Sequence, residues 1–496
     1  MSLLLKRSPF QLAVIAGLLI GCAYPPMPGI TIWIGFIPLI HIWLTETPKE
    51  SARWSFFAGV IVHLISFYWI GLNSGATLVP VLLSLIGAIL YLSIFWAVVG
   101  WLLTTIELRF RNSMAIMPFL WASMEWIRSF GPLGFPWENL AITQSKFLPL
   151  IQMIDVTGSE GVGFWIILLN VILYIFIRTK KPGQKLILTL SLVFFIPWIY
   201  GSLRLKHFDN IPNPEMRTIA AIQPNVNPNQ KWEAAYRNRL YTIMDSLNSN
   251  AYALEPELVL WPEAALPAYM RVSSSRQKFE LQVAETGIPL MMGTVDYERY
   301  DGERRVYNGS IYFGVEGNKM YHKIFLVPFA EYIPLSGYFS VLKKLNFGQA
   351  NFTKGTEFNT FPLDSILFSN MICYESSHPA IARGFVRNGA RFLTIEANDA
   401  WLQNSSGVRQ HFELARLRAV EQRTGIIRSA NTGISGVIQP SGRVYNKVYF
   451  GDQAVFKGDV VLNQGLTFYG RYGSVFAQMC FILTFIQVLW LKRRLK

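Results

Sequence analysis

Residues 78–105 read LVPVLLSLIGAILYLSIFWAVVGWLLTT and contain no charged side chain. A helix needs about 20 consecutive apolar residues to cross a bilayer, and this run is longer than that. Other apolar runs lie near residues 9–24, 30–46, 54–73, 114–131, 162–178, 186–203 and 473–491. The sequence therefore predicts a polytopic α-helical membrane domain with about eight transmembrane helices.

The composition of the 496-residue chain agrees with a membrane protein. Hydrophobic residues make up 51% of it and charged residues only 15%, whereas soluble domains carry about 25% charged residues. The mean hydropathy of +0.29 excludes disordered, collagen-like and coiled-coil chains. The net charge of +14 comes without a basic repeat or zinc-finger spacing, so we expect no nucleic-acid partner.

Lysine and arginine residues gather in alternate loops. Basic clusters lie at residues 6–7, 49–53, 109–111, 178–185 and 492–496, and the intervening loops hold almost no basic residues. Core helices of a soluble protein would not produce this alternation, but the positive-inside rule of membrane proteins does. Both termini are then cytoplasmic. We expect a membrane domain of about seven spans in 1–203, an insert that faces outward in 204–470, and a final span with a basic cytoplasmic tail in 471–496.

The insert has a different pattern, because it is rich in charge and contains short β-like runs. They lie at Thr218–Ile222, Glu257–Trp261, Leu290–Val295, Ser310–Phe313, Asn370–Tyr374, Phe392–Glu396, Gly433–Ile438 and Val460–Leu462. Helical patterns such as Gln410–Gln422 lie between some of them. Strands that alternate with helices predict a layered α/β domain.

One thiol lies in the insert, within Asn370-Met-Ile-Cys-Tyr-Glu-Ser376. Cys373 stands where an apolar strand is expected to end, and strand ends in α/β sheets collect nucleophiles. Most free cysteines are simply small buried hydrophobic residues, and that alternative stays open for Cys373 alone. Cys22 and Cys480 lie in apolar runs, and no cysteine or histidine spacing suits a metal or haem, so we expect no disulfide framework, metal or cofactor.

Two further segments carry ionisable residues beside apolar runs. Glu263 follows a strand-like run and Pro262, which restricts the backbone before it. Lys323 lies among apolar and aromatic residues, and Glu331 follows another apolar stretch. A solvated glutamate and a snorkelling lysine are the commoner explanations of such residues. His378 directly precedes a proline and is interpreted as a turn residue.

Together these segments form a set of motifs. They are Trp261-Pro-Glu-Ala-Ala-Leu-Pro267, His322-Lys-Ile-Phe-Leu-Val-Pro-Phe-Ala-Glu331-Tyr-Ile-Pro334, Ile372-Cys-Tyr-Glu375, Asn398-Asp-Ala-Trp401, Arg428-Ser-Ala-Asn-Thr-Gly433 and, in the membrane part, Gly134-Phe-Pro-Trp137. With them the chain resembles the apolipoprotein N-acyltransferase family, a membrane-bound branch of the nitrilase superfamily. The resemblance covers essentially the whole chain and implies a nitrilase-like α-β-β-α sandwich for the insert.

The resemblance also implies a role for each motif residue. Cys373 would be the nucleophile, Glu263 the general base and Lys323 the cationic member of a triad. Glu331 and Glu375 would support the site. The thiolate would attack an ester carbonyl, and the developing oxyanion needs donors already in place.

Lys323 and the backbone N–H of Tyr374 are the candidate oxyanion donors. Trp232 and Trp401 match family aromatics on loops near the lipid entrance. The implied activity moves an acyl chain from a phospholipid to the N-terminal amine of a diacylglyceryl-modified apolipoprotein, through a cysteine thioester. The implied location is the bacterial inner membrane, with the catalytic domain on the periplasmic side, and we expect a monomer embedded in the lipid bilayer.

Two alternatives remain from the sequence. A membrane-anchored nitrilase-type amidase would hydrolyse the same thioester with water. A lipid carrier would need charged residues inside the bilayer. Glu125 and Arg128 are the one such pair that we single out, and we expect them to pair with each other or to mark the interface. We assign no individual roles to the residues of the polar loop 226–231 before Trp232.

Overall fold

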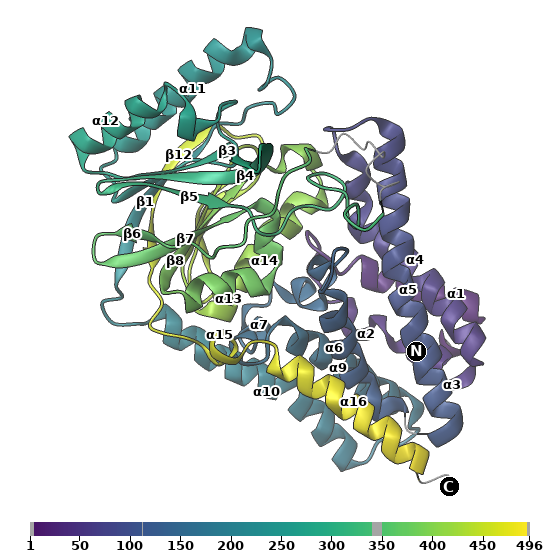
Figure 1. Ribbon diagram of the computed structural model, residues 1–496. Coiled ribbons are helices and arrows are strands. Elements are labelled where there is room, and N and C mark those ends of the chain that lie inside the picture. Colours follow the sequence, from purple (N-terminus) through teal and green to yellow (C-terminus); the bar gives the residue numbers. More distant parts are fainter. Residues whose placement is uncertain (1–3, 112, 340–349, 494–496) are drawn as a thin grey trace. The chain divides into compact units, whose positions relative to one another are not determined.

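The computed structural model describes residues 4–111, 113–339 and 350–493 (Figure 1). The chain divides into two compact units. The helical unit comprises residues 1–71, 82–209 and 472–496, and the sheet unit comprises residues 72–81 and 210–471. Residues 494–496 of the predicted basic tail lie outside the described residues.

Every apolar run predicted as a span contains a helix. The main helices of the helical unit are α1 (Pro9–Gly21), α2 (Ile32–Gly35), α3 (Ile37–Thr45), α4 (Pro48–Phe67), α5 (Leu78–Phe110), α6 (Ser113–Arg128), α7 (Leu148–Ile151), α8 (Ile154–Thr157), α9 (Ser159–Arg178), α10 (Gln184–Asp209) and α16 (Val475–Arg493). Among the described residues, four helical segments are long and apolar enough to cross a membrane: Pro48–Leu72, Leu78–Phe110, Ser159–Arg178 and Gln184–Asp209. A membrane domain is thus supported, and the count of eight spans stays a prediction.

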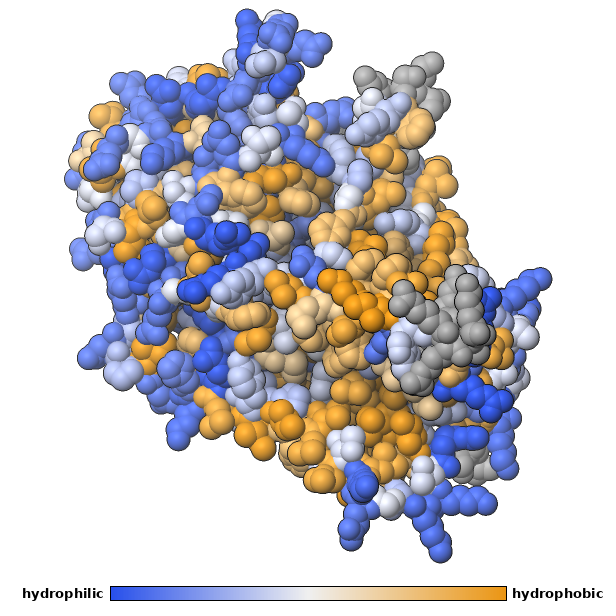
Figure 2. All heavy atoms as spheres, turned by 60° about the horizontal axis from the view of Figure 1, so that its bottom comes forward, coloured by the Kyte–Doolittle hydropathy of each residue, from blue (hydrophilic) through white to orange (hydrophobic). Residues whose placement is uncertain are grey.

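Large apolar side chains are exposed on the outer faces of several of these helices. They include Leu83, Ile86 and Ile94 of α5, Phe195 and Ile196 of α10, and Phe485 and Ile486 of α16. Figure 2 shows a broad apolar surface on this part of the molecule. Water-soluble monomers rarely expose contiguous apolar patches of more than a few hundred Å², so these faces suit lipid contact.

The helical unit also buries charged residues. Arg128 forms an ion pair of 3.0 Å with Glu138, which lies in the 3-10 turn Pro136–Glu138. Glu125 instead accepts a hydrogen bond of 2.9 Å from the backbone N–H of Leu140. The ion-pair partner of Arg128 is thus Glu138, ten residues further on, and the expected pairing of Arg128 with Glu125 is wrong. The other alternative, that Glu125 and Arg128 mark the membrane interface, stays a prediction.

The sheet unit contains two six-stranded sheets. The first has the order β12-β1-β2-β3-β4-β5, and the second has the order β11-β10-β9-β8-β7-β6. The strands are β1 (Met216–Gln223), β2 (Leu258–Leu260), β3 (Leu290–Tyr300), β4 (Glu303–Gly314), β5 (Gly317–His322), β6 (Phe361–Leu363), β7 (Ile366–Ile372), β8 (Ala390–Ala397), β9 (Ile426–Ala430), β10 (Ser435–Ile438), β11 (Val444–Val448) and β12 (Ala454–Val461). Three neighbouring strands in each sheet run parallel, β1-β2-β3 and β7-β8-β9, and the strands outside them pair antiparallel.

Side chains of β1 alternate between two cores, as the two-residue period of a strand requires. Ile219 and Ala221 join a core that contains residues of both sheets. Ala220 and Ile222 join a second core with helices α11 (Ala234–Tyr252) and α12 (Arg276–Thr286). Helices α13 (Pro379–Arg387) and α14 (Ser406–Gln422) pack on the second sheet (Figure 1). The predicted α-β-β-α layering of this unit is confirmed.

Candidate active site

The three proposed triad residues each follow the end of a strand. Glu263 comes three residues after β2, Lys323 directly follows β5, and Cys373 directly follows β7. Glu263 and Lys323 are buried, and Cys373 is half-buried. The strand ends therefore bring together an acid, an amine and a thiol that lie far apart in the sequence.

Lys323 lies between two carboxylates. Its Nζ is 2.9 Å from Oε1 of Glu331 and 3.7 Å from Oε1 of Glu263. The side-chain amide of Asn308, in β4, donates hydrogen bonds of 2.8 Å to both carboxylates. The backbone N–H of Val327 donates to the second oxygen of Glu331 at 2.7 Å. Glu331 is thus held on both oxygens, whereas Glu263 is held by Asn308 and by a longer ion pair.

The charges of this cluster act on the thiol. Burial raises the pKa of Cys373 well above its ordinary value, the Glu263 carboxylate raises it further, and Lys323 opposes both effects. Burial also lowers the pKa of Lys323, but the carboxylates of Glu331 and Glu263 outweigh burial, so that pKa lies above its ordinary value. The resting state is therefore a protonated thiol beside a charged ammonium group, and the thiol needs a base to become a nucleophile.

The backbone at the thiol is in a rare conformation. Cys373 has φ = +51° and begins the 3-10 turn Cys373–Ser377. For a residue other than glycine such a conformation costs about 1–3 kcal/mol, and the conformation persists only where the surrounding structure enforces it. The predicted strand over Asn370–Tyr374 consequently ends two residues early, and the turn presents the thiol at the strand end.

Glu375 connects this turn to the segment after Lys323. Its Oε1 accepts hydrogen bonds from the Tyr321 hydroxyl at 2.7 Å and from the Ile324 backbone N–H at 2.7 Å. Its Oε2 accepts one of 2.8 Å from the backbone N–H of Ile372. Burial raises the pKa of Glu375, and these hydrogen bonds oppose the rise. Glu375 is positioned to fix the thiol turn relative to the lysine.

The remaining predicted site residues lie in different settings. Tyr374 is buried, with its ring edge-on to that of His378. Trp232 is 53% exposed just before α11. Trp401 lies in the 3-10 turn Asp399–Leu402, and its carbonyl accepts a hydrogen bond of 3.3 Å from the Ser74 backbone N–H. The structure thus brings the triad, Glu331 and Glu375 together, and places Trp232 at the surface.

Sequence reasoning missed Asn308 and Lys231. Asn308 bridges the two carboxylates from the middle of β4. Lys231 is buried, and burial lowers its pKa to about 8, although the nearby Glu263 carboxylate opposes that change. In the sequence Lys231 was only one polar residue of the loop 226–231, and no local pattern indicated that it lies near Glu263.

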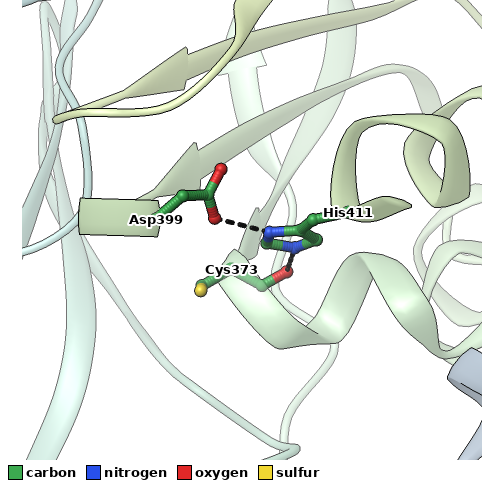
Figure 3. A group of neighbouring side chains, drawn as sticks. All are labelled: Cys373, Asp399 and His411. Carbon is green, nitrogen blue, oxygen red and sulfur yellow. Dashed lines mark hydrogen bonds and ion pairs between the residues drawn. The ribbon is translucent and has the colours of Figure 1, made fainter. Parts of the chain in front are cut away.

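A third missed feature lies behind the thiol. A sulfur, a carboxylate oxygen and a ring nitrogen of Cys373, Asp399 and His411 lie within 4.8 Å of one another (Figure 3). His411 hydrogen-bonds through Nδ1 to Asp399 at 2.6 Å and through Nε2 to the carbonyl oxygen of Cys373 at 2.9 Å. Arg428 forms an ion pair of 2.7 Å with Asp399. A metal ion would have to displace these contacts next to a guanidinium, so we assign no metal to the group.

Two family models match consecutive parts of the chain. The model of the apolipoprotein N-acyltransferase N-terminal domain matches residues 16–172, and the carbon-nitrogen hydrolase model matches residues 218–463. The apolipoprotein N-acyltransferase of Geobacter metallireducens is 33% identical, over 96% of this chain and 94% of its own length. The chain belongs to the apolipoprotein N-acyltransferase family. The resemblance read from the motifs is confirmed.

A second relative agrees with this assignment. The apolipoprotein N-acyltransferase of Chlorobaculum tepidum is 29% identical, over 96% of this chain and 95% of its own length. An amidase of the nitrilase superfamily from Nesterenkonia is similar to 53% of this chain, over 95% of its own length, with 17% identity and a TM-score of 0.37. The chain is a membrane acyltransferase of lipoprotein biosynthesis whose catalytic-type domain is nitrilase-like.

Proposed function

We propose that this chain transfers an acyl chain from a phospholipid to the N-terminal amine of the lipid-modified cysteine of apolipoproteins, through a thioester on Cys373. The observation that carries the proposal is the position of Lys323, within 4 Å of both Glu263 and Glu331, beside a thiol whose pKa responds to all three. Membership of the family supports this choice of substrates.

In the first half-reaction Glu263 takes the thiol proton, and the sulfur attacks the ester carbonyl carbon of the phospholipid. The C–S bond forms, and the carbonyl oxygen becomes an oxyanion that Lys323 and the backbone N–H of Tyr374 stabilise. One such donor contributes about 3 kcal/mol to the transition state. The ester C–O bond then breaks, and Glu263 returns its proton to the leaving lysophospholipid.

In the second half-reaction the neutral N-terminal amine of the lipoprotein attacks the thioester carbon. The C–N bond forms, the C–S bond breaks, and Glu263 takes the amine proton and returns it to the sulfur. Glu331 keeps Lys323 in place, and Glu375 keeps the thiol turn in place. Trp232 and Trp401 provide aromatic surface for the lipid chains.

The membrane arrangement is part of the proposal. Residues 1–203 form about seven spans, residues 204–470 form the periplasmic catalytic domain, and residues 471–496 form the final span and the cytoplasmic tail of an inner-membrane monomer. The alternation of basic loops supports this topology. A periplasmic reporter fused near Asn250 should be active, and activity of a cytoplasmic reporter there would reverse the orientation.

The intact mass of the purified protein tests the chemistry. After incubation with phosphatidylethanolamine, the protein should gain the mass of one acyl group, and hydroxylamine should remove it. Cys373→Ala should show neither the acyl-enzyme nor transfer to a diacylated lipopeptide. Transfer by Cys373→Ala would contradict the thioester mechanism.

The same assay separates acyl transfer from hydrolysis. With labelled phospholipid, an acyltransferase delivers the label to the lipopeptide amine. A membrane-anchored amidase would release it as free fatty acid even when the lipopeptide is present.

A further inference from the structure

The peptide bond between Cys373 and Tyr374 is held from one side. The carbonyl oxygen of Cys373 accepts a hydrogen bond from the Ser376 hydroxyl at 2.9 Å and lies 2.9 Å from Nε2 of His411. Figure 3 shows the imidazole of His411, on α14, between this carbonyl and the carboxylate of Asp399. The His411 contact is therefore with the main chain of Cys373 and not with its sulfur.

Each ring nitrogen of His411 faces an acceptor and has a second polar neighbour: Nδ1 lies 3.0 Å from a guanidinium nitrogen of Arg428, and Nε2 lies 3.0 Å from the Ser376 hydroxyl. Nδ1 lies 2.6 Å from Oδ1 of Asp399, whose other oxygen is paired with Arg428 at 2.7 Å. Burial would raise the pKa of Asp399, but Arg428 and His411 outweigh burial and lower it, so Asp399 is ionised and can only accept. At the other nitrogen, the hydroxyl of Ser376 already donates its hydrogen to Cys373. The carbonyl oxygen of Cys373 can only accept, so its 2.9 Å contact with Nε2 is a hydrogen bond that Nε2–H donates.

The direction of a carbonyl fixes the direction of the next N–H. A trans peptide is planar, so its C=O and N–H bonds point in opposite directions. The donor on the Cys373 carbonyl thereby sets where the Tyr374 N–H points. A hydrogen bond to the carbonyl oxygen also polarises the peptide and strengthens its N–H as a donor.

We propose that His411 is a positioning residue for the oxyanion site: its Nε2–H holds the Cys373 carbonyl so that the Tyr374 N–H faces the oxyanion. Asp399 and Arg428 hold the imidazole in the donating orientation. The three side chains are almost completely buried, at 1%, 1% and 0% exposure for His411, Asp399 and Arg428. This inference rests on the proposed thioester chemistry and adds the residues that orient its oxyanion donor.

Two reactions of the same thiol test the inference, in the full-length protein in detergent micelles. Acyl-enzyme formation from phosphatidylethanolamine passes through an oxyanion. Alkylation by iodoacetamide, followed by mass spectrometry at the Cys373 peptide, is a displacement with no oxyanion. A positioning role therefore affects the first reaction and spares the second, whereas a displaced thiol would affect both.

Three variants are compared with the wild type. His411→Leu should slow acyl-enzyme formation by about 10²- to 10³-fold, with KM nearly unchanged and the alkylation rate within about threefold. His411→Gln should recover part of the loss, because its amide N–H can donate to the Cys373 carbonyl. His378→Gln removes another buried imidazole, five residues after the thiol, and should change acyl-enzyme formation by less than about threefold.

Three outcomes would overturn the inference while leaving the proposed function intact: normal acyl-enzyme formation by His411→Leu, parallel losses in both reactions, or an equal loss in His378→Gln. A wild-type protein that forms no acyl-enzyme would overturn the proposed function itself. The two failures are therefore distinguishable.

Discussion

Each unit buries a cluster of charged residues, and the central groups of the two clusters have opposite charges. In the helical unit one carboxylate, Glu138, is surrounded by basic and polar donors. Arg128 lies 3.0 Å from it, His63 2.7 Å and the Trp96 indole N–H 3.0 Å. In the sheet unit one ammonium group, that of Lys323, is shared by two carboxylates.

The difference lies in how firmly each acid is held. Glu138 and Glu331 each have contacts of 3.0 Å or less on both oxygens. Among the described residues, Glu263 has one hydrogen bond, from Asn308, and an ion pair of 3.7 Å. A carboxylate with close partners on both oxygens stabilises the fold. A carboxylate with fewer close partners beside a thiol can accept the proton of that thiol. The comparison favours Glu263 as the proposed base.

The largest expected effect comes from Glu263→Gln, which keeps the shape and removes the base. Acyl-enzyme formation should fall by about 10²- to 10⁴-fold. The pKa of Cys373 should also fall, because the Glu263 carboxylate raises it and the amide does not. The time course of the intact mass measures the first effect. The pH midpoint of iodoacetamide alkylation at Cys373 measures the second and should move to lower pH.

Lys323→Met is the matched control, because it removes the opposite charge. It should also prevent acylation, but it should move the alkylation midpoint to higher pH, since Lys323 lowers the pKa of Cys373. Shifts of the same sign in both variants would contradict this charge arrangement. Normal acyl-enzyme formation by Glu263→Gln would make Glu331 the next candidate base.

The next effect concerns stability in the helical unit. Arg128→Met leaves Glu138 without its guanidinium partner and should lower the free energy of unfolding by about 3–5 kcal/mol. The double variant Arg128→Met/Glu138→Gln should recover part of this loss, because it buries no unpaired charge. Unfolding in detergent micelles measures both. A loss of acyl-enzyme formation per folded molecule, with unchanged stability, would show that this cluster is not structural.

Glu331→Gln should have a smaller effect on the reaction than Glu263→Gln. It weakens a hydrogen bond to a charged group, which is worth about 1.5–3 kcal/mol, or about 10- to 100-fold in rate. Lys323 keeps its ion pair with Glu263, so some acyl-enzyme should still form and accumulate. Single-turnover measurement with the lipopeptide resolves the two half-reactions. Complete loss of acyl-enzyme formation would contradict this division of roles.

The sequence was sufficient to predict the α/β class and the position of the thiol. Glu263 and Cys373 follow apolar runs and Lys323 precedes one, but the motifs around them and the family resemblance were needed to single out the three together. The carboxyl ends of parallel strands gather at one edge of a sheet, which brings such residues together. The end of β7 was misplaced because no local pattern shows that Cys373 adopts φ = +51°.

Other parts of the site depend on contacts between distant residues. Asn308 is one polar residue within a strand, and only the folding of the chain brings it to Glu263 and Glu331. His411 likewise reads as one histidine on a helical pattern, because its partner Asp399 lies on another segment. The bounds of several predicted spans also differ from the helices: the runs 9–24 and 30–46 extend past helices α1 and α3, whereas α5, α9 and α10 are longer than the runs 78–105, 162–178 and 186–203.

The smallest effect is expected at Trp232, which belongs to neither charge cluster. Because its side chain is 53% exposed, Trp232→Ala should change the free energy of unfolding by no more than about 0.5 kcal/mol. An aromatic surface for lipid chains should instead act on substrate binding. We expect KM for phosphatidylethanolamine to rise about fivefold, which corresponds to about 1 kcal/mol, with kcat nearly unchanged. Trp232→Phe keeps most of the aromatic surface and should stay close to the wild-type KM. A fall in kcat with unchanged KM would place Trp232 in the reaction itself, and would mean that the charge clusters alone do not account for the chemistry.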